Sequence, residues 1–114
     1  MSADPDTRAA PEHPVLELQD TVHQRVRLGL LAVLTEAHRA DFVYLRETLA
    51  LTDGNLARHL GVLEQAGYIA LEKTFENRKP RTWVTITREG RRAFAAELTT
   101  LRALLARIPP EATP

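Results

Sequence analysis

The first regular feature of the chain is an apolar stripe at helical spacing over residues 21–37. Residues three and four apart lie on one face of a helix, so the stripe predicts a helix there, with Asp20 as its N-cap. Leu28 and Leu31 widen the stripe, which favours burial on two sides, against the helix's own domain and against a partner. The stripe itself consists of Val22, Val26, Leu30, Val33, Leu34 and Ala37.

Two shorter helices are predicted next, only a few residues apart. Asp41 is placed to cap the first, whose buried residues would be Phe42, Leu45 and Leu49. Thr52 is placed to cap the second, which ends at Gly67, because glycine readily adopts the left-handed conformation of a helix terminus. The inward face of this second helix would be Leu56, Leu60 and Leu63.

The apolar period then changes from helical to two. Ile69 and Leu71, and later Val84 and Ile86, alternate with other residues as in strands, so a hairpin is predicted. Its connection, residues 76–81, is polar and basic and contains a proline, as expected of an exposed loop. A last helix would begin after Thr87, and its apolar residues are spaced 4, 3, 4 and 3 apart, the pattern of a helix that packs lengthwise on another helix. These residues are Phe94, Leu98, Leu101, Leu105 and Ile108.

This order of elements predicts an α+β fold, mainly helical: a winged helix-turn-helix with a three-helix core, a two-stranded wing and a long C-terminal dimerisation helix. At 114 residues the chain fits one domain. We expect a flexible arm over residues 1–14, the winged-helix domain over 15–108 and a flexible tail over 109–114. The absence of cysteine excludes disulfides, and no apolar run is long enough to span a bilayer, so a cytoplasmic protein is expected.

Charge is distributed unevenly along the chain. The formal net charge is zero, which by itself argues against a nucleic-acid partner. Residues 73–92, however, contain seven basic and two acidic side chains. This segment is therefore a candidate phosphate-binding surface.

The second helix of a helix-turn-helix pair lies in the major groove. Asn55 can pair with adenine, Arg58 can bind guanine or phosphate, and His59 is expected on the same outer part of the helix. Asp53, Gly54 and Asn55 form the first turn after the Thr52 cap, and the exposed amides of this turn can accept a phosphate, so Thr52 and Gly54 are counted with the DNA-binding residues. An ordinary solvated helix face is the alternative interpretation, and the adjoining basic hairpin is what favours DNA.

The hairpin supplies a second group of cations, Lys73, Arg78, Lys79 and Arg81, within reach of a phosphate backbone or minor groove. Arg88, Arg91 and Arg92, at the start of the last helix, could contact either DNA or nearby acids. Phe75 and Trp83 could stack on nucleotides, but attachment of the hairpin to the helices is the favoured role for both.

The sequence offers no catalytic site. It has no nucleophile motif, no glycine-rich phosphate loop and no recognisable carboxylate pair. The histidines, which are His13, His23, His38 and His59, lack the spacing of a metal site. We therefore expect no enzyme activity, no metal and no cofactor.

Residues 27–94 resemble the small winged-helix transcriptional regulators related to the MarR and ArsR groups. The most specific segments are LTDGNLARHLGVLEQAGYI, the RKPRT wing and TREGRRAF at the start of the last helix. The resemblance implies a homodimer that presents two recognition helices to successive major grooves of a pseudo-palindromic operator. It assigns the interface to the first and last helices, and so to Leu28, Leu31, Phe94, Leu98, Leu101, Leu105 and Ile108.

Two departures from the family pattern matter. The cysteine or clustered histidine ligands of ArsR-like metal sensors are absent, and the helices that build the ligand pocket of longer MarR-type regulators are abbreviated. A metal or small-molecule effector is therefore unsupported by the sequence. The leading hypothesis is a prokaryotic, dimeric, sequence-specific regulator of double-stranded DNA that represses by blocking promoter access. A protein-interaction module and an architectural DNA-binding protein without sequence preference are the alternatives.

Overall fold

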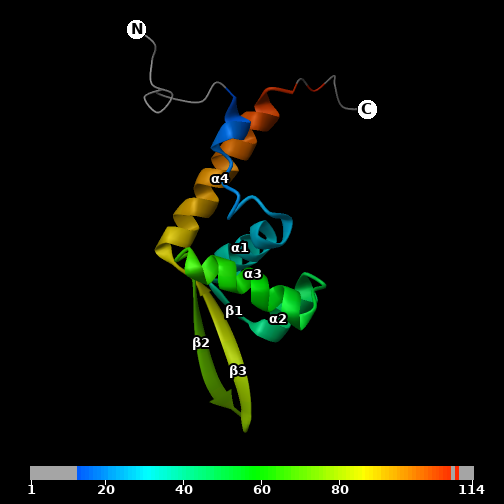
Figure 1. The fold of residues 1–114 in the computed structure, drawn as a ribbon, viewed down its shortest axis with the longest axis vertical. Helices are drawn as coiled ribbons and strands as arrows, with labels where there is room; N and C mark the ends of the chain where they lie inside the picture. The colour runs from blue at the N-terminus through cyan, green and yellow to red at the C-terminus, as the bar shows by residue number, and fades with distance from the viewer. Residues whose placement is uncertain (1–12, 109, 111–114) are drawn as a thin grey trace.

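Three helices and a three-stranded antiparallel sheet share one core, and a fourth helix extends away from it (Figure 1). The computed structural model describes residues 13–108 and residue 110. The predicted flexible arm and tail lie mostly outside the described residues. The elements are η2 (Pro14–Glu17), α1 (Arg25–Ala37), β1 (Arg39–Asp41), α2 (Phe42–Thr48), α3 (Asp53–Gln65), β2 (Ile69–Glu76), β3 (Lys79–Ile86) and α4 (Arg88–Ala106).

Side-chain caps fix where three of the helices begin, as predicted. The Asp41 carboxylate accepts a hydrogen bond from the backbone N–H of Tyr44 at the start of α2. The hydroxyls of Thr52 and Thr87 do the same at the starts of α3 and α4. Each cap satisfies one amide that the helix leaves without an internal partner. Gly67, with φ of 82°, follows α3 in the left-handed conformation that was expected.

The predicted start of α1 is wrong. The helix begins at Arg25 with Gln24 as its N-cap, whereas residues 18–24 form a non-helical segment, here called the strap. The Arg27 side chain donates to the backbone carbonyls of Asp20 and Thr21, so these carbonyls bind a side chain instead of helical amides. Val22 is still fully buried, which explains its place in the apolar stripe.

The sheet has the order β1-β3-β2, and it contains a strand that sequence reasoning missed. β1 is three residues long and pairs with β3 from Arg39 opposite Thr85 to Asp41 opposite Trp83. A segment this short shows no readable period.

The hairpin connection is also shorter than predicted. The strands continue to Glu76 and Lys79, which pair, and only Asn77 and Arg78 form the turn, with φ of 52° and 65°. Positive φ at both positions suits a two-residue turn that matches the twist of the strands. Lys79 and Glu76 form the hydrogen-bonded pair that closes the hairpin. The nitrogen of the next residue, Pro80, therefore points away from β2, toward the edge of β3 that β1 does not reach. Pro80 has no N–H, and no backbone hydrogen bond is lost at this position.

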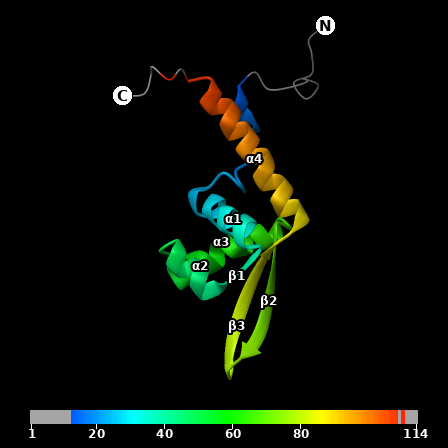
Figure 2. The same ribbon diagram turned by 180° about the vertical axis from the view of Figure 1, so that it is seen from behind.

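The core lies where α1, α3 and the inner half of the sheet meet, and its fully buried residues include Leu30, Leu34, Leu56, Leu63 and Val84. The outer half of the β2–β3 hairpin projects from this body as the wing, and α4 extends from the opposite end (Figure 2). Among the described helices, none is both long enough and apolar enough to cross a membrane.

Candidate nucleic-acid interface

The outward side of α3 is a strip of exposed residues three and four positions apart: Gly54, Arg58, Gly61 and Gln65. Asn55, exposed beside it, accepts a hydrogen bond from Arg58 at 3.2 Å between Oδ1 and Nη2. Both side chains can offer hydrogen-bonding groups to a base edge. We call these five residues the α3 strip.

The two glycines of the α3 strip are not required by the fold. A Cβ at Gly54 or at Gly61 would meet no atom within 4 Å. Glycine inside a helix lowers the stability by about 1 kcal/mol relative to alanine. Gly61 therefore destabilises α3, and no contact within the protein requires a glycine there. Glycines at this place lower the surface and let another molecule approach the helix backbone closely.

The first turn of α3 is linked to α2. Arg46 donates to Asp53 at 2.7 Å, and this contact is exposed. Asp53, next to the Thr52 cap, is therefore ion-paired, and the positive charge of Arg46 compensates its negative charge. The backbone amide of Gly54 lies in the same turn, next to this pair.

The expectation that His59 faces outward is wrong. His59 is only 6% exposed, and its Nδ1 lies 3.1 Å from an Arg27 Nη atom. Burial, together with the charges of Arg58 and Arg27, lowers the pKa of His59 below its ordinary value of 6.5. His59 sits at the margin of the inward face, and spacing alone could not tell on which side of that margin it falls.

The wing has two faces with different chemistry, because successive side chains of a strand alternate between faces. The front face continues the core-facing side of the sheet, against which α3 packs, and carries Lys73, Phe75, Pro80 and Thr82. The back face carries Glu72, Thr74, Glu76, Lys79, Arg81 and Trp83. Arg81 therefore lies on the face away from α3. The sequence alone groups Arg81 with the other wing cations and does not assign it to a different face.

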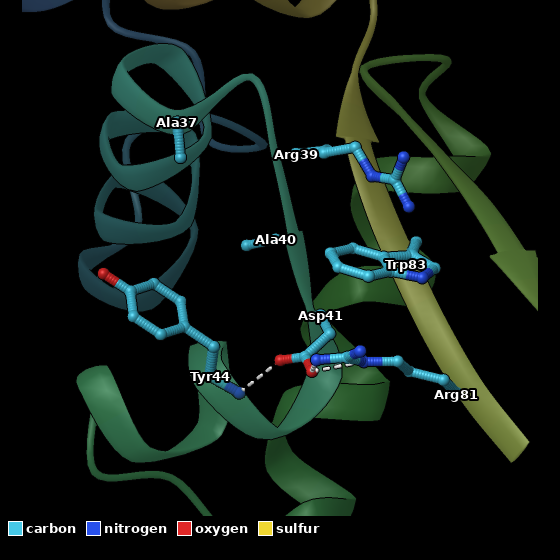
Figure 3. A pocket seen from close by; sticks show the side chains of 7 residues that line it. All are labelled: Ala37, Arg39, Ala40, Asp41, Tyr44, Arg81 and Trp83. Carbon is cyan, nitrogen blue, oxygen red and sulfur yellow. Dashed lines mark hydrogen bonds and ion pairs between the residues drawn. The ribbon is translucent and has the colours of Figure 1, made fainter. Parts of the chain in front are cut away.

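Arg81 is held in a network on the back face. It donates to Asp41 at 2.8 Å and to Glu76 at 2.9 Å, and Figure 3 shows its side chain reaching from β3 to the start of α2. Glu76 also accepts from the Trp83 indole at 3.0 Å and from the Thr74 hydroxyl at 2.8 Å. The guanidinium groups of Arg39 and Arg81 stack on Trp83, at 3.8 and 4.6 Å from the ring centroid.

These contacts stabilise the ionised carboxylates. Hydrogen bonds from Trp83, Thr74 and Arg81 lower the pKa of Glu76 from 4.5 to about 2. The Tyr44 amide and Arg81 lower the pKa of Asp41. Arg81 thus joins the wing to the helix-turn-helix, and its positive charge is largely compensated.

The remaining wing cations are exposed. The side chains of Lys73, Arg78 and Lys79 make no hydrogen bond or ion pair with any residue in the described part of the chain. Phe75, expected to attach the hairpin to the helices, is instead 72% exposed on the front face, because the wing extends beyond the body there. The front face and turn of the wing therefore combine available positive charge with an exposed aromatic ring.

The arginines at the start of α4 differ from one another. Arg91 contacts the Nδ1 of His38, so it joins α4 to the loop after α1. Arg88 and Arg92 are exposed on the first turns of the helix.

The residues assigned to a dimer interface fall into three groups. Leu31 is fully buried and Phe94 is 7% exposed, so both belong to the protomer's own core and have little surface left for a partner. Leu28 and Leu98 pack partly against that core, and Leu101 is half-buried. Leu105, near the end of α4, and Ile108, just beyond that end, are 66% and 51% exposed.

A shallow hollow of about 300 Å³ lies beside the Arg81 network, between β1, α2 and β3 (Figure 3). Tyr44, Trp83 and Ala40 form part of its lining. In residues 13–108 and 110, no three His, Asp or Glu side chains gather where they could bind a metal ion.

With its fold and surface described, the chain can be placed in a family. It belongs to the family described as Winged helix DNA-binding domain, which it matches over residues 26–105. It is 42% identical over 69 residues to an uncharacterized protein of Methanocaldococcus jannaschii, an alignment that covers 60% of this chain and 75% of the relative.

Solved structures agree with this assignment. A transcriptional regulator homologue from Pyrococcus horikoshii OT3 superposes with a TM-score of 0.77 and 32% identity, covering 82% of this chain and 95% of that one. The fold is also that of Sco3205, a MarR family transcriptional regulator from Streptomyces coelicolor in complex with DNA, with a TM-score of 0.60, 21% identity, and 86% and 71% coverage. The winged-helix fold and the MarR resemblance are thereby confirmed. The family is described as a DNA-binding domain and the two solved structures as a transcriptional regulator homologue and a transcriptional regulator, which agrees with the expectation that the protein is not an enzyme.

Proposed function

We propose that this protein is a transcriptional regulator that binds duplex DNA in a sequence-dependent way, with the α3 strip in the major groove and the wing on the backbone or minor groove. The observation that carries the proposal is the α3 strip, whose exposed Asn55 and Arg58 lie beside two glycines that the fold does not need. Small residues permit close approach, and the two polar side chains can bond base edges.

The wing supports the same proposal through its available cations. Lys73 lies on the front face, the side of the sheet that α3 contacts, and Arg78 and Lys79 lie at the tip. Three cations on one projecting hairpin suit a phosphate backbone. Arg81 has a different role in this proposal, because its contacts to Asp41 and Glu76 orient the wing instead of binding phosphate.

We further propose that the protein acts as a homodimer on a pseudo-palindromic operator and represses by blocking promoter access. The apolar surface at the far end of α4 supports the dimer: Leu105 and Ile108 are exposed there, and Val15 and Leu16 of η2, which packs on α4, are exposed as well. A second copy of the same surface is a matched partner for such a patch. Sco3205, which shares the fold, was solved in complex with DNA.

The test is fluorescence anisotropy with a labelled duplex selected by the protein from a random-sequence library, compared with an unselected duplex of equal length across a salt series. Binding should fall steeply with salt, and Lys73→Ala and Arg78→Ala should each reduce the slope of log K against log salt by about one. Arg102→Ala, which removes an exposed cation from α4, is the matched control and should leave the slope unchanged.

Three results would contradict parts of this proposal. Equal affinity for the selected and unselected duplexes would indicate an architectural protein without sequence preference. No binding of either duplex at low salt would indicate a protein-interaction module instead. Loss of affinity with Arg102→Ala as large as with the wing variants would show that general positive charge, not the wing, binds DNA.

A further inference from the structure

The side chain of Arg27 connects the recognition helix α3 to α1 and to the strap. The guanidinium of Arg27, on α1, donates through Nε to the Thr21 carbonyl at 2.7 Å and through an Nη atom to the Asp20 carbonyl at 3.2 Å. Its other Nη atom lies 3.1 Å from Nδ1 of His59 on α3. One side chain therefore joins α1, the strap and α3.

The chemistry of this contact fixes the state of His59. A guanidinium group has donors only, and it keeps its proton at any physiological pH. Nδ1 of His59 must therefore be the acceptor, which requires a neutral ring with its hydrogen on Nε2. Burial, with the charges of Arg58 and Arg27, lowers the pKa of His59 and so favours this neutral form.

The opposite side of the strap is attached to α4. The backbone N–H of Gln19 donates to Glu97 at 3.3 Å, and the Nδ1 of His23 lies 3.0 Å from the other oxygen of the same carboxylate. Glu97 is only 2% exposed, whereas the His23 side chain is 42% exposed, so only the carboxylate end of these contacts is shielded from water. Contacts thus run without interruption from α4 through the strap and Arg27 to α3.

We propose that Arg27 is a positioning residue for the recognition helix α3. Protonation of His59 then breaks the hydrogen bond between Arg27 and His59, which releases α3 and weakens DNA binding. With both ring nitrogens protonated, His59 has no acceptor to offer, and two cations then face each other. The charged groups that face His59 among the described residues are Arg27 from α1 and Arg58 from α3. The strap carbonyls of Asp20 and Thr21 bind the guanidinium of Arg27. The inference rests on the proposed function.

The expected sign distinguishes this mechanism from ordinary charge effects. Protonated histidines add positive charge and would strengthen binding to phosphate as the pH falls. Release of α3 has the opposite effect, so affinity for the selected duplex should decrease from pH 7.5 to pH 5.5, by no more than about tenfold per pH unit for one linked proton.

The decisive variant is His59→Asn, because the Asn Oδ1 can accept from Arg27 where Nδ1 does and does not titrate. It should bind as the wild type does at pH 7.5 and show no decrease at pH 5.5. His59→Leu, which has no acceptor, should bind weakly at both pH values. His38→Asn is the matched control: His38 has φ of 68°, which Asn tolerates, and this variant should keep the wild-type pH profile.

A measurement without DNA separates failure of this inference from failure of the proposed function. The His59 ring resonance, assigned by its absence in His59→Asn, should titrate below pH 6.5 in the wild type and at higher pH in Arg27→Gln, because a nearby positive charge has been removed. An identical titration in Arg27→Gln would overturn the proposal, as would affinity that rises or stays constant on acidification. If no duplex binds at pH 7.5, the proposed function fails, and the titration still tests the contact.

Discussion

At the scale of single residues, Gly90 and Gly61 both lie in helices, yet their surroundings differ. A Cβ at Gly90 would collide with the carbonyl oxygen of Tyr68 and lie 3.0 Å from Cγ1 of Ile86. At Gly61 a Cβ would meet nothing within 4 Å. Gly90 is thus required by the close approach of α4 to Tyr68, between α3 and β2, whereas an intermolecular contact is the reason we propose for Gly61.

Gly90→Ala should destabilise the protein. Overpacking in a filled site costs typically about 1–3 kcal/mol, and the colliding atom here belongs to the backbone, which moves less readily than a side chain. Urea denaturation followed by circular dichroism should show a lower midpoint. An unchanged midpoint would mean that α4 can shift away from Tyr68 without cost.

Gly61→Ala should have the opposite effect on stability and a separate effect on binding. The free energy of unfolding should rise by about 0.5–1 kcal/mol, because alanine favours the helix. Affinity for the selected duplex should fall by about tenfold, equivalent to about 1.4 kcal/mol, because the added methyl group prevents close approach. Thermal melts and anisotropy measure the two quantities, and a variant that is more stable and binds equally well would show that the α3 strip does not contact DNA at this point.

At the scale of elements, the orientation of the wing depends on contacts that cross between elements. Two strands alone form a weak structure in water, and the outer half of this hairpin lies beyond the core. Arg81 joins it to Asp41 at the start of α2, and Glu76 joins the two strands through Trp83 and Arg81. The wing is therefore fixed relative to the start of α2 by a few polar contacts on its back face.

This network should give the protein a defined acid sensitivity. Because the pKa of Glu76 is lowered from 4.5 to about 2 in the folded state, its contribution to stability is complete above pH 4.5 and is lost as the pH falls toward 2. Glu76→Gln should therefore show a smaller decrease in Tm between pH 4.5 and pH 2 than the wild type. Glu72→Gln, an exposed neighbour on the same face, is the control and should retain the wild-type decrease.

At the scale of the whole molecule, α4 is the helix whose apolar residues the protomer's own core does not fully cover. Its first half contributes Phe94 and Glu97 to buried positions, but Leu105 near its end is 66% exposed. A helix of 19 residues is about 28 Å long, more than this small core covers. Its far end, with η2, is the surface that we assign to a second copy of the chain.

Leu105→Glu should convert the proposed dimer into a monomer, because it places a charge in the centre of an apolar contact. Light scattering should report half the mass of the wild type, while circular dichroism should show that the helices remain. Ala103→Glu, on another side of α4 and also exposed, should leave the mass unchanged. A dimer that persists in Leu105→Glu would remove this surface from the proposed interface.

The sequence by itself determined features that depend on neighbouring residues. The caps Asp41, Thr52 and Thr87, the inward leucines of α3 and the change of period at Ile69 follow from local hydrogen bonds and helix or strand geometry, so the winged-helix fold could be predicted. The tertiary structure alone decided the direction and partners of side chains near an element's margin. His59 contacts Arg27 of α1, Arg81 donates a hydrogen bond to Asp41, and Glu97 accepts a hydrogen bond from Gln19 of the strap. Those partners come from distant parts of the chain, and spacing within one helix or strand carries no information about them.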